Sequence, residues 1–187
     1  MHREQMMAKN FLTRGICRFR LHKSLFTVGF LLWLLASGAA LAGNALFSEP
    51  VDIAGHGTVE VVLASGNDKY GYTHIKKRHV VGTITNPGGI TSFFPAGYEV
   101  RPGVMTPPLM SEEDIINLIA EAAASGSQSP QGSRVVVDYN PNAFGISSLK
   151  VVIDLSDGDI ITAYPTDGPS VCVYSDKNHR VEGGDCR

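Results

Sequence analysis

Several catalytic signatures are absent from this sequence of 187 residues. It contains no phosphate-binding glycine fingerprint, no His-Glu-x-x-His, no Cys-x-x-Cys and no Gly-x-Ser-x-Gly. These absences argue against glycine-loop nucleotide binding, zinc-dependent hydrolysis and serine-hydrolase chemistry. We therefore expect a protein that uses no metal and no cofactor.

Basic residues are scarce after the N-terminal segment. From Gly43 onward, 10 Lys and Arg stand against 17 Asp and Glu, a formal charge of −7. A protein that holds nucleic acid through a broad basic surface needs the opposite balance. An anionic ligand would have to be held locally, and four of the ten basic residues lie between Lys69 and Arg78.

Cysteine is also rare, with three in the chain. Cys17 lies in the N-terminal segment, which leaves Cys172 and Cys186 as an even pair. Such a pair is typical of an exported protein. We predict a Cys172–Cys186 disulfide, whose loop of about 14 residues would stabilise the polar C-terminal tail by ~3 kcal/mol.

The N-terminal segment resembles an export signal. Basic residues between Arg14 and Lys23 precede an uncharged run from Leu25 to Ala42, which ends in Ala-Leu-Ala. We predict a signal peptide over residues 1–42, cleaved near Ala42. The alternative is an uncleaved anchor, because the run is just long enough to span a bilayer. After cleavage the protein would be periplasmic or extracellular, without stable membrane association.

The remaining sequence predicts one α+β domain, an antiparallel sheet with one main helix packed on it. We interpret residues 43–69 as a lead-in segment that contains a strand over 58–64. We interpret residues 81–108 and 125–133 as loops, with at most one short strand in the first of them. The main helix follows Ser111, a good N-cap, and ends at Gly126. Further strands are expected in RVVVDY, LKVVIDL, DIITAYP and VCVY, with Ser156-Asp157-Gly158 as a hairpin turn.

Two histidines, His74 and His79, flank Lys76, Lys77 and Arg78 in a segment that could form a short helix. Cleavage of RNA without metal needs a base for the 2′-hydroxyl, an acid for the leaving 5′-oxygen and cationic groups at the phosphate. Histidine and basic side chains supply both. By composition alone, however, such a pair is more often part of a solvated surface.

Geometry limits this interpretation. Residues five apart on a regular α-helix differ by about 140° around its axis. His74 and His79 would therefore meet at one phosphate only if the chain bends between them. Otherwise one would act with a group from elsewhere, such as His56, His179 or Lys150.

Thr162 and Tyr164 lie two apart in DIITAYP and would project from one face of a strand. A hydroxyl that donates to phosphate, next to a ring that stacks on a base, is suited to nucleotide binding. Thr and Tyr are also common strand residues, so the pair alone indicates nothing.

In their order along the chain, these features resemble the bacterial, toxin-type EndoU nuclease family. The matching motifs are His74-Ile75, Phe-Phe-Pro at 93–95, the DIINLIAEAA helix and the hairpin that ends in Thr162-Ala163-Tyr164-Pro165. The resemblance covers about residues 70–166. We accordingly interpret residues 70–187 as an EndoU-like nuclease domain with a C-terminal tail.

The resemblance implies a secreted, metal-independent endoribonuclease that leaves a 2′,3′-cyclic phosphate, and a cognate immunity protein as partner. It implies that His74 is one catalytic histidine and that Thr162 and Tyr164 bind the nucleotide. The family's second histidine follows a Gly-rich stretch, but the corresponding GTITNPGG has none. We assign its role to His79.

Arg78, Lys76 and Lys150 are the expected substrate-binding cations. Two alternatives remain open at this stage. One is an exported binding or envelope protein that keeps the fold without catalysis. The other is a related RNA-cleaving toxin fold in which His79 and Arg78 act alone.

Overall fold

A computed structural model describes residues 44–187. The expected signal peptide, residues 1–42 with Cys17, lies outside the described residues. Within 44–187 the fold is α+β, and every pairing between its strands is antiparallel. None of the helices within residues 44–187 has the length and hydrophobicity of a membrane span.

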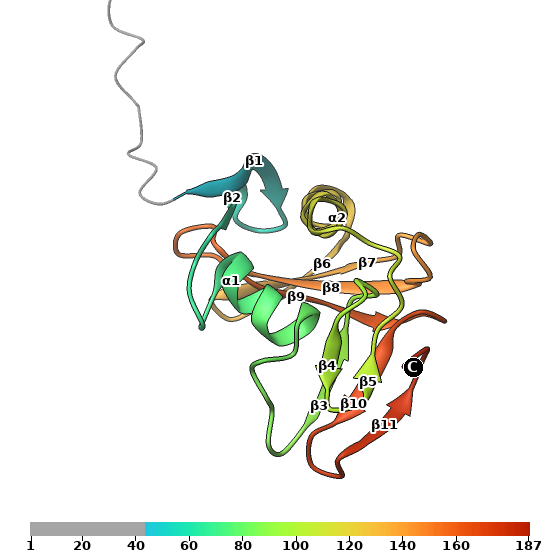
Figure 1. The fold of residues 1–187 in the computed structure, drawn as a ribbon. Helices are drawn as coiled ribbons and strands as arrows, with labels where there is room; N and C mark the ends of the chain where they lie inside the picture. Colours follow the sequence, from blue (N-terminus) through green and yellow to red (C-terminus); the bar gives the residue numbers. More distant parts are fainter. Residues whose placement is uncertain (1–43) are drawn as a thin grey trace, which may run out of the picture. The chain divides into compact units, whose positions relative to one another are not determined.

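The main sheet has four strands in the order β6-β7-β8-β9 (Figure 1). The strands are β6 (Ser127–Gln131), β7 (Arg134–Tyr139), β8 (Ser148–Asp154) and β9 (Ile160–Asp167). Alternate residues of β8 are buried, as expected for a sheet with one covered face. The expected hairpin joins β8 to β9, and Gly158 adopts a positive φ of 80° in its turn.

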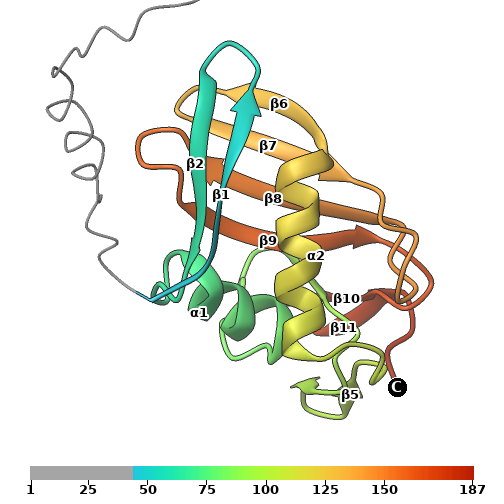
Figure 2. The same ribbon diagram turned by 90° about the horizontal axis from the view of Figure 1, so that it is seen from above.

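Helix α2 (Glu112–Ser125) lies across one face of this sheet (Figure 2). Ser111 caps it as predicted: its hydroxyl accepts from the Asp114 N–H, and the Asp114 carboxylate accepts from the Ser111 N–H. The apolar stripe packs against β7 and β8. It consists of Ile115, Leu118, Ile119, Ala122 and Ala123.

Two segments interpreted as irregular are strands. The lead-in contains β1 (Ala45–Ile53), which pairs with β2 (Gly57–Ala64), and the polar loop after α2 contains β6. In β1 alternate residues turn inward, but Glu49 is one of them and interrupts the apolar pattern. Strand β6 is a mostly exposed edge strand, so its polar sequence SQSPQ carries no burial signal.

The segment 81–108, interpreted as loop with at most one short strand, contributes three: β3 (Ile90–Phe93), β4 (Glu99–Arg101) and β5 (Val104–Met105). Strand β3 pairs with β10 (Cys172–Ser175), which in turn pairs with β11 (Arg180–Gly183). The predicted disulfide joins Cys172 to Cys186. It fixes the C-terminal tail against this second, three-stranded sheet.

Candidate active site

The two histidines lie on a helical segment with one widened turn. Helix α1 (Gly71–Ile75) continues directly into η1 (Lys76–Val80), a π-helical turn. The Val81 N–H donates to the Lys76 carbonyl at 2.8 Å, a bond that spans five residues rather than four. Because this turn holds more residues than an α-helical turn, residues five apart come close to one face.

Packing gives the physical reason for the widened turn. The sequence pairs a histidine with an aliphatic residue twice, as His74-Ile75 and His79-Val80, and all four side chains are buried. Ile75 and Val80 both join the main hydrophobic core. An α-helical turn would place these two pairs on different sides of the helix. The wider turn places them on one side, so that both aliphatic residues are buried in the core and both histidines lie beside them.

The histidine rings lie 6.4 Å apart, centroid to centroid, at 73°. Each ring is fixed by a backbone carbonyl: His74 Nδ1 lies 2.8 Å from the Asp68 oxygen, and His79 Nδ1 lies 2.9 Å from the Ser92 oxygen. A carbonyl can only accept, so Nδ1 carries the hydrogen in both rings. Nε2 of each ring is left free, so that it can accept a proton when the ring is neutral and donate one when the ring is protonated.

Burial dominates the electrostatics of His79. Only 5% of this residue is exposed, and this loss of hydration lowers its pKa to about 3. The hydrogen bond to Ser92 opposes the shift of this pKa, while electrostatic interaction with Arg78 and His74 adds to it. The lowered pKa means that His79 is neutral at neutral pH.

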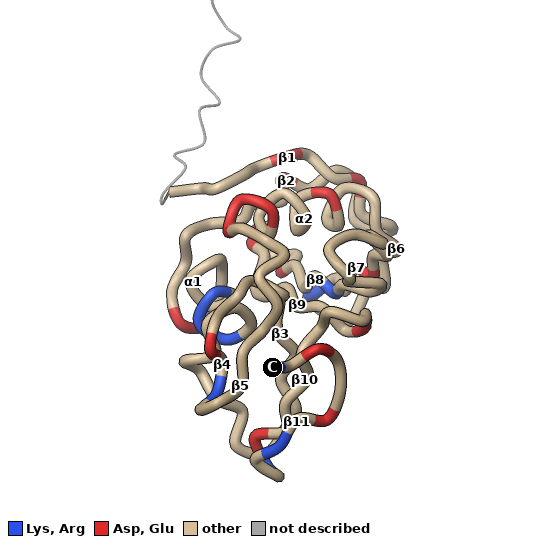
Figure 3. Tube along the Cα trace, turned by 45° about the vertical axis from the view of Figure 1, so that its right-hand side comes forward, with Lys and Arg blue, Asp and Glu red and all other residues tan. Residues whose placement is uncertain are grey.

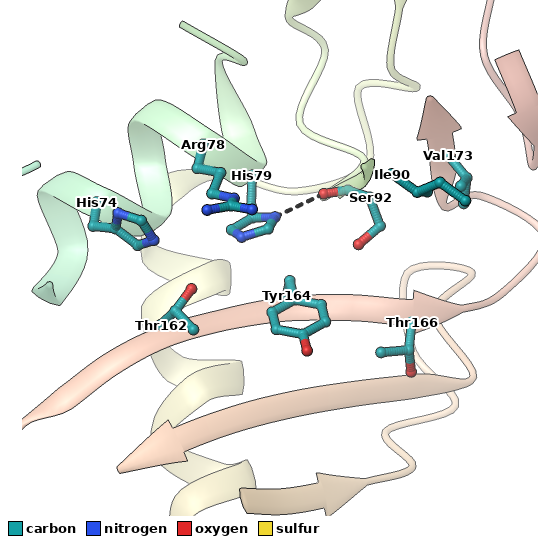
Figure 4. A pocket seen from close by; sticks show the side chains of 9 residues that line it. All are labelled: His74, Arg78, His79, Ile90, Ser92, Thr162, Tyr164, Thr166 and Val173. Carbon is teal, nitrogen blue, oxygen red and sulfur yellow. Dashed lines mark hydrogen bonds between the residues drawn. The ribbon is translucent and has the colours of Figure 1, made fainter. Parts of the chain in front are cut away.

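Strand β9 lies opposite the histidines and presents Thr162 and Tyr164 to them (Figure 4). Thr162 Oγ1 is buried and has no hydrogen-bond partner among residues 44–187. The Tyr164 ring stacks on His79, with centroids 5.1 Å apart and planes at 20°. The ring expected to stack on a base thus has one face against the histidine.

Of the three expected substrate-binding cations, Arg78 alone lines the cavity. Its Nε is buried and, within the described chain, has no partner. Lys76 forms an ion pair with Glu112 at 2.5 Å. Lys150 pairs with Tyr164 in the β8–β9 register, but its ammonium lies 3.4 Å from Asp138. We therefore leave both lysines out of the site.

These groups share one cavity of about 380 Å³, which is lined by nine residues. They are His74, Arg78, His79, Ile90, Ser92, Thr162, Tyr164, Thr166 and Val173. No carboxylate is among them, although the described chain is acidic. The two other histidines considered from sequence, His56 and His179, are exposed and are not part of this lining.

Four lining residues were missed by sequence reasoning. Thr166 continues the alternation of Thr162 and Tyr164 along β9 and could have been found from it. Ile90, Ser92 and Val173 belong to strands whose pairing, β3 with β10, joins segments about 80 residues apart. No local pattern signals that pairing.

Residues 44–187 contain no cluster of three or more His, Cys, Asp or Glu side chains that could hold a metal ion. The cavity instead offers imidazole nitrogens, one guanidinium and hydroxyl groups, which are suited to an anionic ligand.

Comparisons of the chain with protein-family models, curated proteins and solved structures found no match.

Proposed function

We propose that this protein is a secreted, metal-independent endoribonuclease of the EndoU type that leaves a 2′,3′-cyclic phosphate. One observation carries the proposal. Two histidines with free Nε2 atoms line a single cavity with an unpartnered arginine Nε and an unpartnered threonine hydroxyl. Acid, base and anion-binding groups are thus within reach of one phosphodiester.

The chemistry needs two proton transfers. One histidine accepts the 2′-hydroxyl proton, the 2′-oxygen forms a bond to phosphorus, and the bond from phosphorus to the 5′-oxygen breaks. The other histidine donates its proton to that leaving oxygen. We assign the base to His79, which is neutral at neutral pH, and the acid to His74. A bound phosphate would raise the pKa of His79, because its negative charge stabilises the imidazolium.

Arg78 and Thr162 would hold the phosphate. A guanidinium without a carboxylate in its cavity can neutralise the charge that gathers on the non-bridging oxygens. The Thr162 hydroxyl can donate to one of them. Tyr164 would hold the His79 ring by stacking, a role different from the base stacking expected from its place on the strand beside Thr162.

The decisive experiment is cleavage of RNA by the purified protein in excess chelator. We expect products that end in 2′,3′-cyclic phosphate. His74→Gln and His79→Gln should each lose about 10²–10⁴-fold in rate, whereas the exposed His56→Gln should keep full activity. Full activity in both site variants, or no cleavage by the wild type, would sink the proposal.

Two alternatives make different predictions in the same assay. A non-catalytic exported binding protein, which the charge of −7 and the low pKa of His79 favour, would bind RNA without cutting it. A related toxin that uses His79 and Arg78 alone would keep its activity in His74→Gln. For an antibacterial toxin, we further propose an immunity protein that blocks the cavity.

A further inference from the structure

The cavity continues past the histidine pair onto an uncharged surface. Ile90 and Ser92 from β3, Val173 from β10 and Thr166 from β9 form this second region, which we call the Ile90 platform (Figure 4). The proposed mechanism uses none of its side chains.

The strand register explains why the side chains of the platform form one surface. Val173 pairs directly with Ser92, and Ile90 lies two residues from Ser92, so the three side chains share one face of the β3–β10 pair. Phe93 and Cys172 pack beneath the opposite face in a buried cluster. Ile90 is 60% exposed.

The polar groups of the platform are neutral hydroxyls. The Thr166 hydroxyl is hydrogen-bonded to Ser148 Oγ at 2.8 Å. The Ser92 hydroxyl can donate or accept, while its backbone carbonyl holds His79. Ser92 therefore connects the two ends of the cavity.

An apolar surface edged by neutral hydroxyls fits a nucleobase. A base has flat, weakly polar faces and an edge of hydrogen-bond donors and acceptors. A second phosphate would gain nothing there, because no cation lines this end. The platform also lies directly beside the anion-binding end of the cavity, just as the nucleoside lies directly beside the phosphate in a nucleotide.

We propose that the Ile90 platform binds the base of the nucleotide adjoining the phosphate at His74 and His79. The inference rests on the proposed function for the position of that phosphate. The platform contributes binding and base preference and takes no part in proton transfer.

The test compares three probes by NMR titration of the purified protein: inorganic phosphate, adenosine 3′-monophosphate and uridine 3′-monophosphate. We expect at least one nucleotide to bind about tenfold more tightly than phosphate and to shift the Ile90 methyl signals. Ile90→Ser should weaken nucleotide binding roughly threefold to tenfold, through lost apolar contact, and leave phosphate binding unchanged.

Two control variants make the result specific. Ile90→Leu keeps the apolar surface and should bind nucleotides like the wild type. Leu109→Ser makes the same kind of change at another exposed apolar residue, one outside the cavity lining, and should have no effect. Equal binding of phosphate and both nucleotides, no detectable nucleotide binding, or equal effects of Ile90→Ser and Leu109→Ser would each overturn the inference.

The outcomes separate this inference from the nuclease proposal. Nucleotide binding that depends on Ile90, without RNA cleavage, would reject the nuclease and keep the base site. RNA cleavage with nucleotide binding unaffected by Ile90→Ser would keep the nuclease and reject the base site.

Discussion

His79 has the least ordinary surroundings of the histidines in the described chain. It is buried, hydrogen-bonded through Nδ1 to a strand carbonyl, and stacked on a tyrosine. A structural histidine is held in the same way, but His79 also presents Nε2 to a cavity with a second histidine and an arginine. That combination separates a candidate base from a packing residue.

The lowered pKa of His79 predicts a pH dependence of stability. Unfolded histidine titrates near pH 6.5, whereas folded His79 titrates at about 3. Between these values the unfolded state binds a proton that the folded state does not, so stability falls as pH falls. The loss from this residue should be roughly 1 kcal/mol per pH unit between pH 6 and pH 4.

Urea denaturation of the wild type and of His79→Gln at several pH values measures this loss. The difference between the two unfolding free energies should change by that slope, since the other titrating groups are common to both proteins. Parallel pH profiles would show that His79 is not buried in the neutral form.

The variant Thr162→Val tests whether the unpartnered Thr162 hydroxyl forms a hydrogen bond to the substrate. RNA cleavage should fall about tenfold or more. The free energy of unfolding should stay unchanged or rise by up to about 1 kcal/mol, because a buried polar atom without a partner is lost.

The matched change is Thr91→Val. The Thr91 hydroxyl is also buried but donates to Asp176 at 3.1 Å, so its loss should cost about 1–3 kcal/mol of stability. Comparable destabilisation by both variants would mean that Thr162 makes a structural hydrogen bond.

At the scale of elements, the site depends on two features that bring distant groups together. The widened turn of η1 aligns His74 with His79, and the pairing of β3 with β10 places Ser92 where it holds His79. Strand β10 contains both Val173, which lines the cavity, and Cys172, which forms the disulfide with Cys186. The stability of this strand pair therefore bears directly on the geometry of the site.

Loss of the disulfide should destabilise the protein markedly. Cys186→Ser opens a loop with a separation of 14 residues and should lower the free energy of unfolding by about 2–4 kcal/mol. Denaturation with and without dithiothreitol checks this: reductant should lower the stability of the wild type by a similar amount and leave the variant unchanged. A wild type insensitive to complete reduction would contradict the prediction.

Across the whole molecule, acidic residues are spread over strands, loops and helix α2, and the basic residues of 76–78 lie together on one helical segment (Figure 3). Lys76 and Lys77 of this group are paired with carboxylates. Of residues 76–78, Arg78 alone is directed into the cavity of the two histidines, and this segment does not form a basic surface that could follow an RNA backbone.

This distribution predicts a weak dependence of RNA binding on salt. With one or two phosphates neutralised, the affinity for single-stranded RNA should fall only about threefold to sevenfold between 50 mM and 200 mM salt. Binding of a non-cleavable RNA to the His74→Gln variant measures it. A fall of a hundredfold or more would reveal a larger basic contact surface.

Features that depend on neighbouring residues could be predicted from the sequence. The α+β class, helix α2 with its Ser111 cap, the β8–β9 hairpin and the Cys172–Cys186 pair were all predicted correctly. Helix caps, apolar periodicity and turn glycines act over a few residues, so they can be recognised in the sequence. The disulfide could be predicted because Cys172 and Cys186 are the only two cysteines after the N-terminal segment. The EndoU-like activity is still a prediction.

The assembly of the site could not be predicted in this way, because it depends on contacts between segments that are far apart in the sequence. The five-residue repeat His-Ile, His-Val was visible in the sequence, but burial of Ile75 and Val80 in a common core selects the wide turn that aligns the histidines. Strands β1 and β6 were missed because an inward Glu49 and an exposed polar edge hide their alternation. The Ile90 platform exists because β3 pairs with β10, and long-range pairing of this kind depends on packing that no local segment encodes.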